Sequence, residues 1–165
     1  MSEFLKVCLK AETDIRRKMV LKRLTAIFGL LGLLAASPGY AQTADQLAVI
    51  YKDPNCGCCQ GYADHLRRNG FRVEVRNTAV LDAIKRRYSV PPALASCHTM
   101  RIGGYTVEGH VPVSTVKKLL CERPKIAGIA LPGMPQGSPG MPGPKVEPFI
   151  VYQLGNGAPK TFHVE

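Results

Sequence analysis

The sequence predicts an α/β sandwich in which helices flank a mixed sheet. Short apolar or alternating runs take turns with helical patterns, in the order β-α-β-α-β-β-α over residues 47–123. The strand–helix–strand unit at the start of this order predicts a parallel strand pair, because a crossover helix joins parallel strands. The chain of 165 residues is long enough for one domain of ordinary size.

The first strand and the first helix lie on either side of a break at residues 53–55. Residues 47–51 form a continuous apolar run, which is typical of a buried strand. Residues 58–69 carry apolar side chains at helical spacing, and Gly70 is a natural stop for that helix.

The second strand and the second helix follow directly. Residues 71–76 alternate between apolar and charged side chains, which predicts a half-buried strand. Apolar residues from Val80 to Tyr88 then repeat with a period of 3.6, and we expect Asn77 or Thr78 to cap this second helix.

The rest of the chain contains a turn-rich segment between its last elements. A β-hairpin, a third helix and a final strand or hairpin are expected at residues 97–108, 112–123 and 149–164. Residues 127–144 are rich in Gly and Pro, so we expect a long loop without regular structure. This order, with a thiol motif between the first strand and the first helix, is the layout of a thioredoxin-like domain.

Residues 1–41 have the features of an N-terminal extension and a signal peptide. From Met19 the chain has a basic stretch, then an apolar run and then small residues up to Ala41. This order predicts a signal peptide that is cleaved after Ala41. The apolar run is shorter than the roughly 18 residues of a spanning helix, so no membrane span is expected after processing. Residues 1–18 are interpreted as a start site placed too early. Residues 42–165 are then a single exported domain with the thioredoxin-like layout.

The charge pattern predicts no nucleic-acid partner. The formal net charge is +10, but the basic residues are scattered and no motif combines them with aromatic residues. A solvated basic surface explains this pattern.

Three cysteines, Cys56, Cys58 and Cys59, are crowded at the expected start of the first helix. Neighbouring cysteines bridge only with strain, and the helix dipole favours thiolates. Soft thiolates select Cu(I) or Zn(II). Zinc ligands usually lie two to four residues apart, whereas the tighter Cys-x-Cys-Cys spacing fits sulfurs that bridge several Cu(I) ions. Cu(I) is therefore the predicted metal, and zinc is the less favoured one.

Further donors are expected downstream. Cys97 is the fourth predicted ligand, because it begins a strand that can face the first helix. His98 beside it is the next candidate ligand, with a hydrogen-bonded strand residue as the alternative. His110, Met134 and Met141 are additional candidates: the histidine either caps the third helix or ligates, and the methionines either bind Cu(I) or cover the core. His65 lies too far along its helix, and Cys121 is expected in the core.

Four motifs together resemble the CopG-like family of periplasmic metal-binding proteins. They are Asp53-Pro54-Asn55-Cys56-Gly57-Cys58-Cys59, Ser96-Cys97-His98-Thr99, Gly104 to Pro112 and Gly128 to Met141. The family is a "domain of unknown function" group associated with copper resistance. This resemblance implies a thioredoxin-like fold, copper handling in the periplasm, and a Cys-x-Cys-Cys plus later Cys site. The chain departs from the family at Tyr62, where many relatives carry Trp, and at Pro142, where many carry an acidic residue.

The predicted function is that of a periplasmic Cu(I)-thiolate protein serving copper tolerance, by sequestration or by Cu(I)/Cu(II) redox exchange, with a site that can be polynuclear. The alternative is a thioredoxin-like thiol-disulfide oxidoreductase, because Cys56 and Cys59 have Cys-x-x-Cys spacing. Whether the protein is an enzyme stays open, although a binding role is favoured. The expected partners are copper ions and copper-resistance or export proteins of the periplasm.

Overall fold

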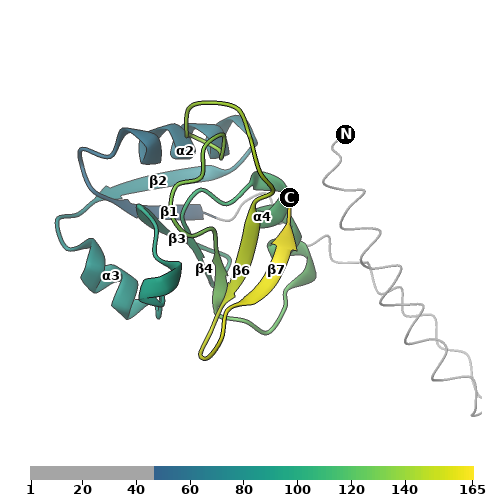
Figure 1. The fold of residues 1–165 in the computed structure, drawn as a ribbon. Helices are drawn as coiled ribbons and strands as arrows, with labels where there is room; N and C mark the ends of the chain where they lie inside the picture. Colours follow the sequence, from purple (N-terminus) through teal and green to yellow (C-terminus); the bar gives the residue numbers. More distant parts are fainter. Residues whose placement is uncertain (1–46) are drawn as a thin grey trace, which may run out of the picture.

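A computed structural model describes residues 47–165 of the chain (Figure 1). These residues form a seven-stranded sheet in the order β2-β1-β3-β4-β5-β6-β7. The strands are β1 (Leu47–Lys52), β2 (Arg72–Asn77), β3 (His98–Ile102), β4 (Tyr105–Glu108), β5 (Gly128–Ala130), β6 (Ile150–Leu154) and β7 (Lys160–Val164). The helices are α2 (Gly57–Arg68), α3 (Leu81–Arg87), α4 (Val113–Glu122) and a 3-10 turn, η2 (Pro92–Leu94).

The sheet is mixed, as the sequence predicts. β1 is parallel to β2 and β4 is parallel to β5, whereas the other neighbours are antiparallel. The predicted parallel pair is confirmed, because α2 carries the chain from β1 back to the start of β2. The predicted hairpin is also confirmed, with β3 and β4 joined at Gly103-Gly104. The fold class, an α/β sandwich with a mixed sheet, is therefore correct and is compatible with a thioredoxin-like arrangement.

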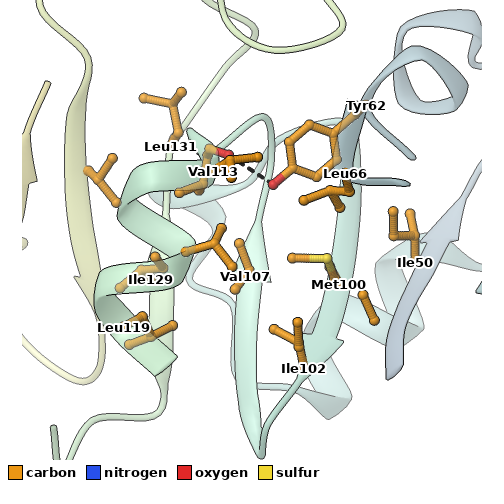
Figure 2. Packing of buried hydrophobic residues seen from close by; sticks show 14 of the residues in the cluster. Ile50, Tyr62, Leu66, Met100, Ile102, Val107, Val113, Leu119, Ile129 and Leu131 are labelled. Carbon is orange, nitrogen blue, oxygen red and sulfur yellow. Dashed lines mark hydrogen bonds between the residues drawn. The ribbon is translucent and has the colours of Figure 1, made fainter. Parts of the chain in front are cut away.

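Helices cover both faces of the sheet. Tyr62 and Leu66 of α2 share one core with Met100 of β3 and Leu119 of α4 (Figure 2). Because side chains alternate along a strand, Thr99 of β3 points to the other face, where α3 lies. The buried ion pair described below joins α3 to that face.

Two local predictions are wrong. Residues 127–144 are not entirely irregular, because they contain β5, which pairs with β4 and β6. A Cβ atom at Gly128 would lie 1.9 Å from the carbonyl oxygen of Thr106, so this glycine serves a close strand approach and not a turn. The second helix is capped by neither Asn77 nor Thr78: its N-cap is Val80, and Thr78 Oγ1 instead accepts a bond from the Val80 N–H at 3.1 Å.

The predictions for residues 1–41 lie outside the described residues. Within residues 47–165, no helix is both long enough and apolar enough to cross a membrane.

Candidate metal centre

The Cys-x-Cys-Cys motif lies in the first turn of α2, directly after β1. Cys56 is the N-cap residue of α2, and Cys58 and Cys59 follow in its first turn. Cys56 and Cys59 are joined as a disulfide with a Cα–Cα distance of 5.5 Å, and Cys58 carries a free thiol. The Cys58 Sγ atom lies 3.3 Å from the Cys56 Sγ atom. The structure therefore shows the oxidised form of the Cys-x-x-Cys pair, with the third sulfur beside it.

Cys97 faces this helix end because of the strand order. β1 and β3 are antiparallel, with Lys52 opposite His98, so the end of β1 meets the start of β3. The Cys97 Sγ atom lies 3.3 Å from the Cys59 Sγ atom. The prediction that Cys97 joins the helix cysteines is thus supported by the geometry.

Two buried histidines complete the cluster. His98 Nδ1 lies 3.4 Å and His110 Nε2 lies 2.9 Å from the Cys97 Sγ atom. Both rings are fully buried and meet edge to face, with centroids 5.0 Å apart. The ring of Tyr62 packs against both. His110, which the sequence leaves between a capping role and a ligand role, therefore belongs to the cluster.

The tautomer of neutral His110 follows from its second contact. Its Nδ1 atom lies 2.6 Å from the carbonyl oxygen of Pro139, which can only accept a hydrogen bond. Nδ1 therefore carries the proton and Nε2 presents its lone pair toward Cys97. A carbonyl that orients a histidine in this way is a common feature of metal sites.

Burial sets the protonation states of the free protein. It raises the pKa of the Cys97 thiol to about 12, and the electrostatic interaction with the neighbouring Cys58 adds to this effect. Burial also lowers the pKa of His98 well below its ordinary value, helped by electrostatic interactions with His110, Lys85 and Lys52. The pKa of His110 is lowered by burial as well, although the bond to Pro139 opposes this. Both imidazoles are therefore neutral donors near pH 7.

The donors form two groups that overlap. One group is Cys56, Cys58, Cys59 and Cys97, and the other is Cys59, Cys97, His98 and His110; within each, the donor atoms lie within 4.8 Å of one another. His98 Nε2 is the one fully buried side-chain N or O atom in residues 47–165 that has no hydrogen-bond partner. Sulfur and imidazole donors suit Cu(I) and Zn(II), so this donor set fits a soft metal.

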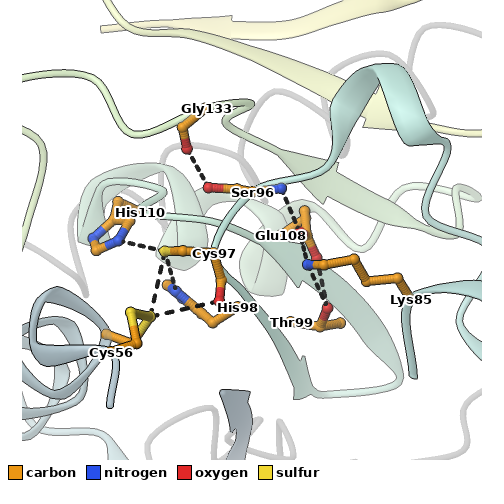
Figure 3. Close-up of polar contacts among 10 residues, drawn as sticks. Cys56, Lys85, Ser96, Cys97, His98, Thr99, Glu108, His110 and Gly133 are labelled. Atoms are coloured by element: carbon orange, nitrogen blue, oxygen red, sulfur yellow. Dashed lines mark hydrogen bonds and ion pairs between the residues drawn. A yellow bond between two sulfur atoms is a disulfide. The ribbon is translucent and has the colours of Figure 1, made fainter. Parts of the chain in front are cut away.

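A buried ion pair supports the cluster from the opposite face of the sheet. Glu108 of β4 is fully buried and pairs with Lys85 of α3. Its carboxylate also accepts bonds from the Ser96 N–H at 2.7 Å and the Thr99 hydroxyl at 2.7 Å (Figure 3). Because Ser96 directly precedes Cys97, this carboxylate holds the backbone that carries the fourth cysteine. Glu108 has only a weak local signal in the sequence, an acidic residue at the end of a short strand, and it is not among the predicted site residues.

Four further residues singled out from the sequence are Met134, Met141, His65 and Cys121. Met134 is 52% exposed, and Met141 is half-buried in the loop that covers α2, so their role as copper ligands stays a prediction. His65 is not a member of either group, as expected. Cys121 of α4 is also outside them, and it is half-buried instead of belonging to the core.

Comparisons with known proteins agree on one family. A family model described as "Protein of unknown function, DUF411" matches residues 94–141. The solved structure "Copper resistance protein copG- Form 2" is 39% identical, covers 73% of this chain and 98% of its own chain, and superposes with a TM-score of 0.68. The corresponding "Form 1" is 40% identical over 72% of this chain and 96% of its own, with a TM-score of 0.66. None of the curated proteins matches.

Proposed function

Because this chain belongs to the CopG-like copper-resistance family, we propose that it binds copper as Cu(I) on the Cys56, Cys58, Cys59 and Cys97 sulfurs. His98 and His110 supply nitrogen donors to the same site. The binding serves copper tolerance in the periplasm, either by sequestering the ion or by exchanging it between Cu(I) and Cu(II).

One observation carries this proposal: the two donor groups share Cys59 and Cys97. A shared thiolate can bridge two metal ions, and Cu(I) accepts the low coordination numbers that such bridging produces. A single zinc ion needs only four ligands, so it would leave part of this donor set unused. The overlap therefore supports a polynuclear Cu(I) site.

Metal counting tests the proposal. The reduced protein is loaded with Cu(I) under anaerobic conditions, washed with a competing chelator, and analysed for copper and zinc per chain. A Cys56→Ser/Cys58→Ser/Cys59→Ser variant should bind no more than the one ion that Cys97, His98 and His110 can hold, whereas the control His65→Asn should keep all of the copper. The control changes a histidine of the same helix that belongs to neither donor group. Equal copper in the triple variant and the wild type would refute the proposal.

The loop methionines and the cell compartment belong to this proposal as well. Met134 is exposed enough to meet incoming copper, so a Met134→Leu/Met141→Leu variant should load Cu(I) more slowly but to the same final amount. Cell fractionation should find the mature chain in the periplasm, with its N-terminus at residue 42.

A second candidate function is thiol-disulfide exchange. The disulfide between Cys56 and Cys59 at the start of α2 has the Cys-x-x-Cys spacing of that enzyme class. Reduction of a model disulfide by the metal-free protein tests this function. Turnover that copper does not inhibit would favour it over copper binding, because a copper site occupies the same sulfurs.

A further inference from the structure

Two sulfurs of the candidate metal centre have two incompatible uses. Cys56 and Cys59 form a disulfide, and the same two residues belong to the donor groups. A sulfur in a disulfide has no thiolate charge with which to bind a metal, because the thiolate is the ligand. The closed pair therefore withdraws two donors from the all-cysteine group and leaves Cys58 and Cys97.

The other donor group keeps most of its members when the pair is closed. Only Cys59 is lost, and Cys97, His98 and His110 remain. In the disulfide form shown here, both imidazoles still lie within 3.4 Å of the Cys97 Sγ atom. Cys97 directly precedes β3, His98 begins that strand and His110 follows β4, so none of the three belongs to α2. One thiolate with two imidazoles is a sufficient set for a single copper ion.

We propose that the Cys56–Cys59 pair is a redox switch that reduces the copper capacity of the site from a polynuclear set to one ion at Cys97, His98 and His110. This inference rests on the proposed copper-binding function and specifies how that function is regulated. Closing the pair forms one S–S bond and takes one electron from each thiolate. A small-molecule disulfide accepts both electrons: its own S–S bond breaks by exchange, and it leaves as two thiolates, which take up protons from the solvent.

The switch is tested by counting copper in both redox states. The protein is prepared fully reduced, or oxidised with glutathione disulfide and then freed of glutathione, and each form is loaded with Cu(I) under anaerobic conditions. Alkylation followed by peptide mass spectrometry identifies the linked cysteines. We expect a loss from two or more copper ions per chain to one on oxidation, with Cys56 linked to Cys59. The remaining copper should shift the NMR signals of the His110 ring.

Two variants make the result decisive. Cys56→Ser/Cys59→Ser removes both sulfurs, so it should bind one copper ion whether or not the oxidant was present. Cys58→Ser keeps the pair intact, so its copper content should still fall on oxidation. These opposite responses separate closure of the Cys56–Cys59 pair from general damage by the oxidant.

Each remaining outcome overturns a stated part of the reasoning. Equal copper in both redox states of the wild type overturns the switch, and so does a disulfide that links other cysteines. An oxidised chain that binds no copper overturns the assignment of the remaining ion to Cys97, His98 and His110. A reduced chain that binds no copper overturns the proposed function itself, which distinguishes the two failures.

Discussion

Replacing Gly140 with alanine should displace the loop of residues 131–144 from α2 and loosen the histidine end of the metal centre. Figure 1 shows this loop passing over α2. Gly140 has a φ of +86°, and a Cβ atom there would lie 2.5 Å from the Tyr62 amide nitrogen and 2.7 Å from the Cys58 carbonyl oxygen. The preceding residue, Pro139, supplies the carbonyl that orients His110. The glycine therefore links loop packing to the orientation of a candidate ligand.

The size of the effect can be worked out from two contributions. A left-handed backbone costs a residue with a side chain roughly 1–2 kcal/mol. The atoms that the new methyl group would meet are backbone atoms of a helix, which cannot turn away, and overpacking of this kind costs roughly 1–3 kcal/mol. We therefore expect Gly140→Ala to lower the free energy of unfolding by roughly 2–5 kcal/mol.

Two other glycines serve as matched controls. Gly133 has a φ of +67° and no atom within 4 Å of an added Cβ atom, so Gly133→Ala should cost only the backbone part, roughly 1–2 kcal/mol. Gly155 has neither a left-handed φ nor a close neighbour, so Gly155→Ala should be nearly neutral. Urea denaturation of the metal-free proteins measures all three. If Gly140→Ala is no less stable than Gly133→Ala, the loop does not pack on α2 as described.

Three further predictions concern the buried groups around the site. Burial lowers the pKa of His98, so this residue binds a proton more readily in the unfolded chain than in the folded one. As the pH falls below about 6.5, the free energy of unfolding of the metal-free protein should therefore decrease, by up to about 1.4 kcal/mol per pH unit. Urea titrations at several pH values measure this slope, and His98→Gln should flatten it. Tyr62→Phe leaves the Val111 carbonyl without the 2.9 Å bond that it now accepts, so thermal unfolding should show a loss of about 1–3 kcal/mol, and an unchanged midpoint would contradict the contact. Glu108→Gln leaves Lys85 as an unpaired buried charge, so the free energy of unfolding measured in denaturant should fall by about 3–5 kcal/mol. Adding Lys85→Met should restore part of that loss. Full stability of the single variant would argue against the ion pair.

The sequence predicts most of the fold because most of its signals are local. The alternation over residues 71–76 and the Gly-Gly turn at 103–104 act through neighbouring residues, and β2, β3 and β4 form where these patterns place them. The position of Cys56, Cys58 and Cys59 at a helix start is predictable for the same reason. The break after the first strand and the helical spacing of apolar residues after the cysteines determine this position.

The features that the sequence misses or leaves open depend on contacts between distant residues. Gly128 looks like a loop residue until β4 is placed beside it, because only then does the close approach to Thr106 require the missing side chain. The inclusion of His110 in the site likewise depends on the turn at Gly109, where an added Cβ atom would lie 2.4 Å from the Leu131 carbonyl oxygen. The cysteine spacing shows which sulfurs can meet, but whether Cys56 and Cys59 are oxidised depends on their surroundings and not on the spacing.

The helix cysteines and Cys97 are held in place by different parts of the fold, and this difference has a chemical consequence. A metal ligand must be held to within about 0.5 Å of its working position, and Cys97 meets this need through Glu108, which bonds to the Ser96 N–H and is itself fixed by Lys85. That support comes from β4 and α3 and does not involve α2. Closing or opening the Cys56–Cys59 bond therefore changes donors on the helix while the ion pair keeps Cys97 in place. A site divided in this way can change its number of donors with redox state and still keep one set of ligands ready.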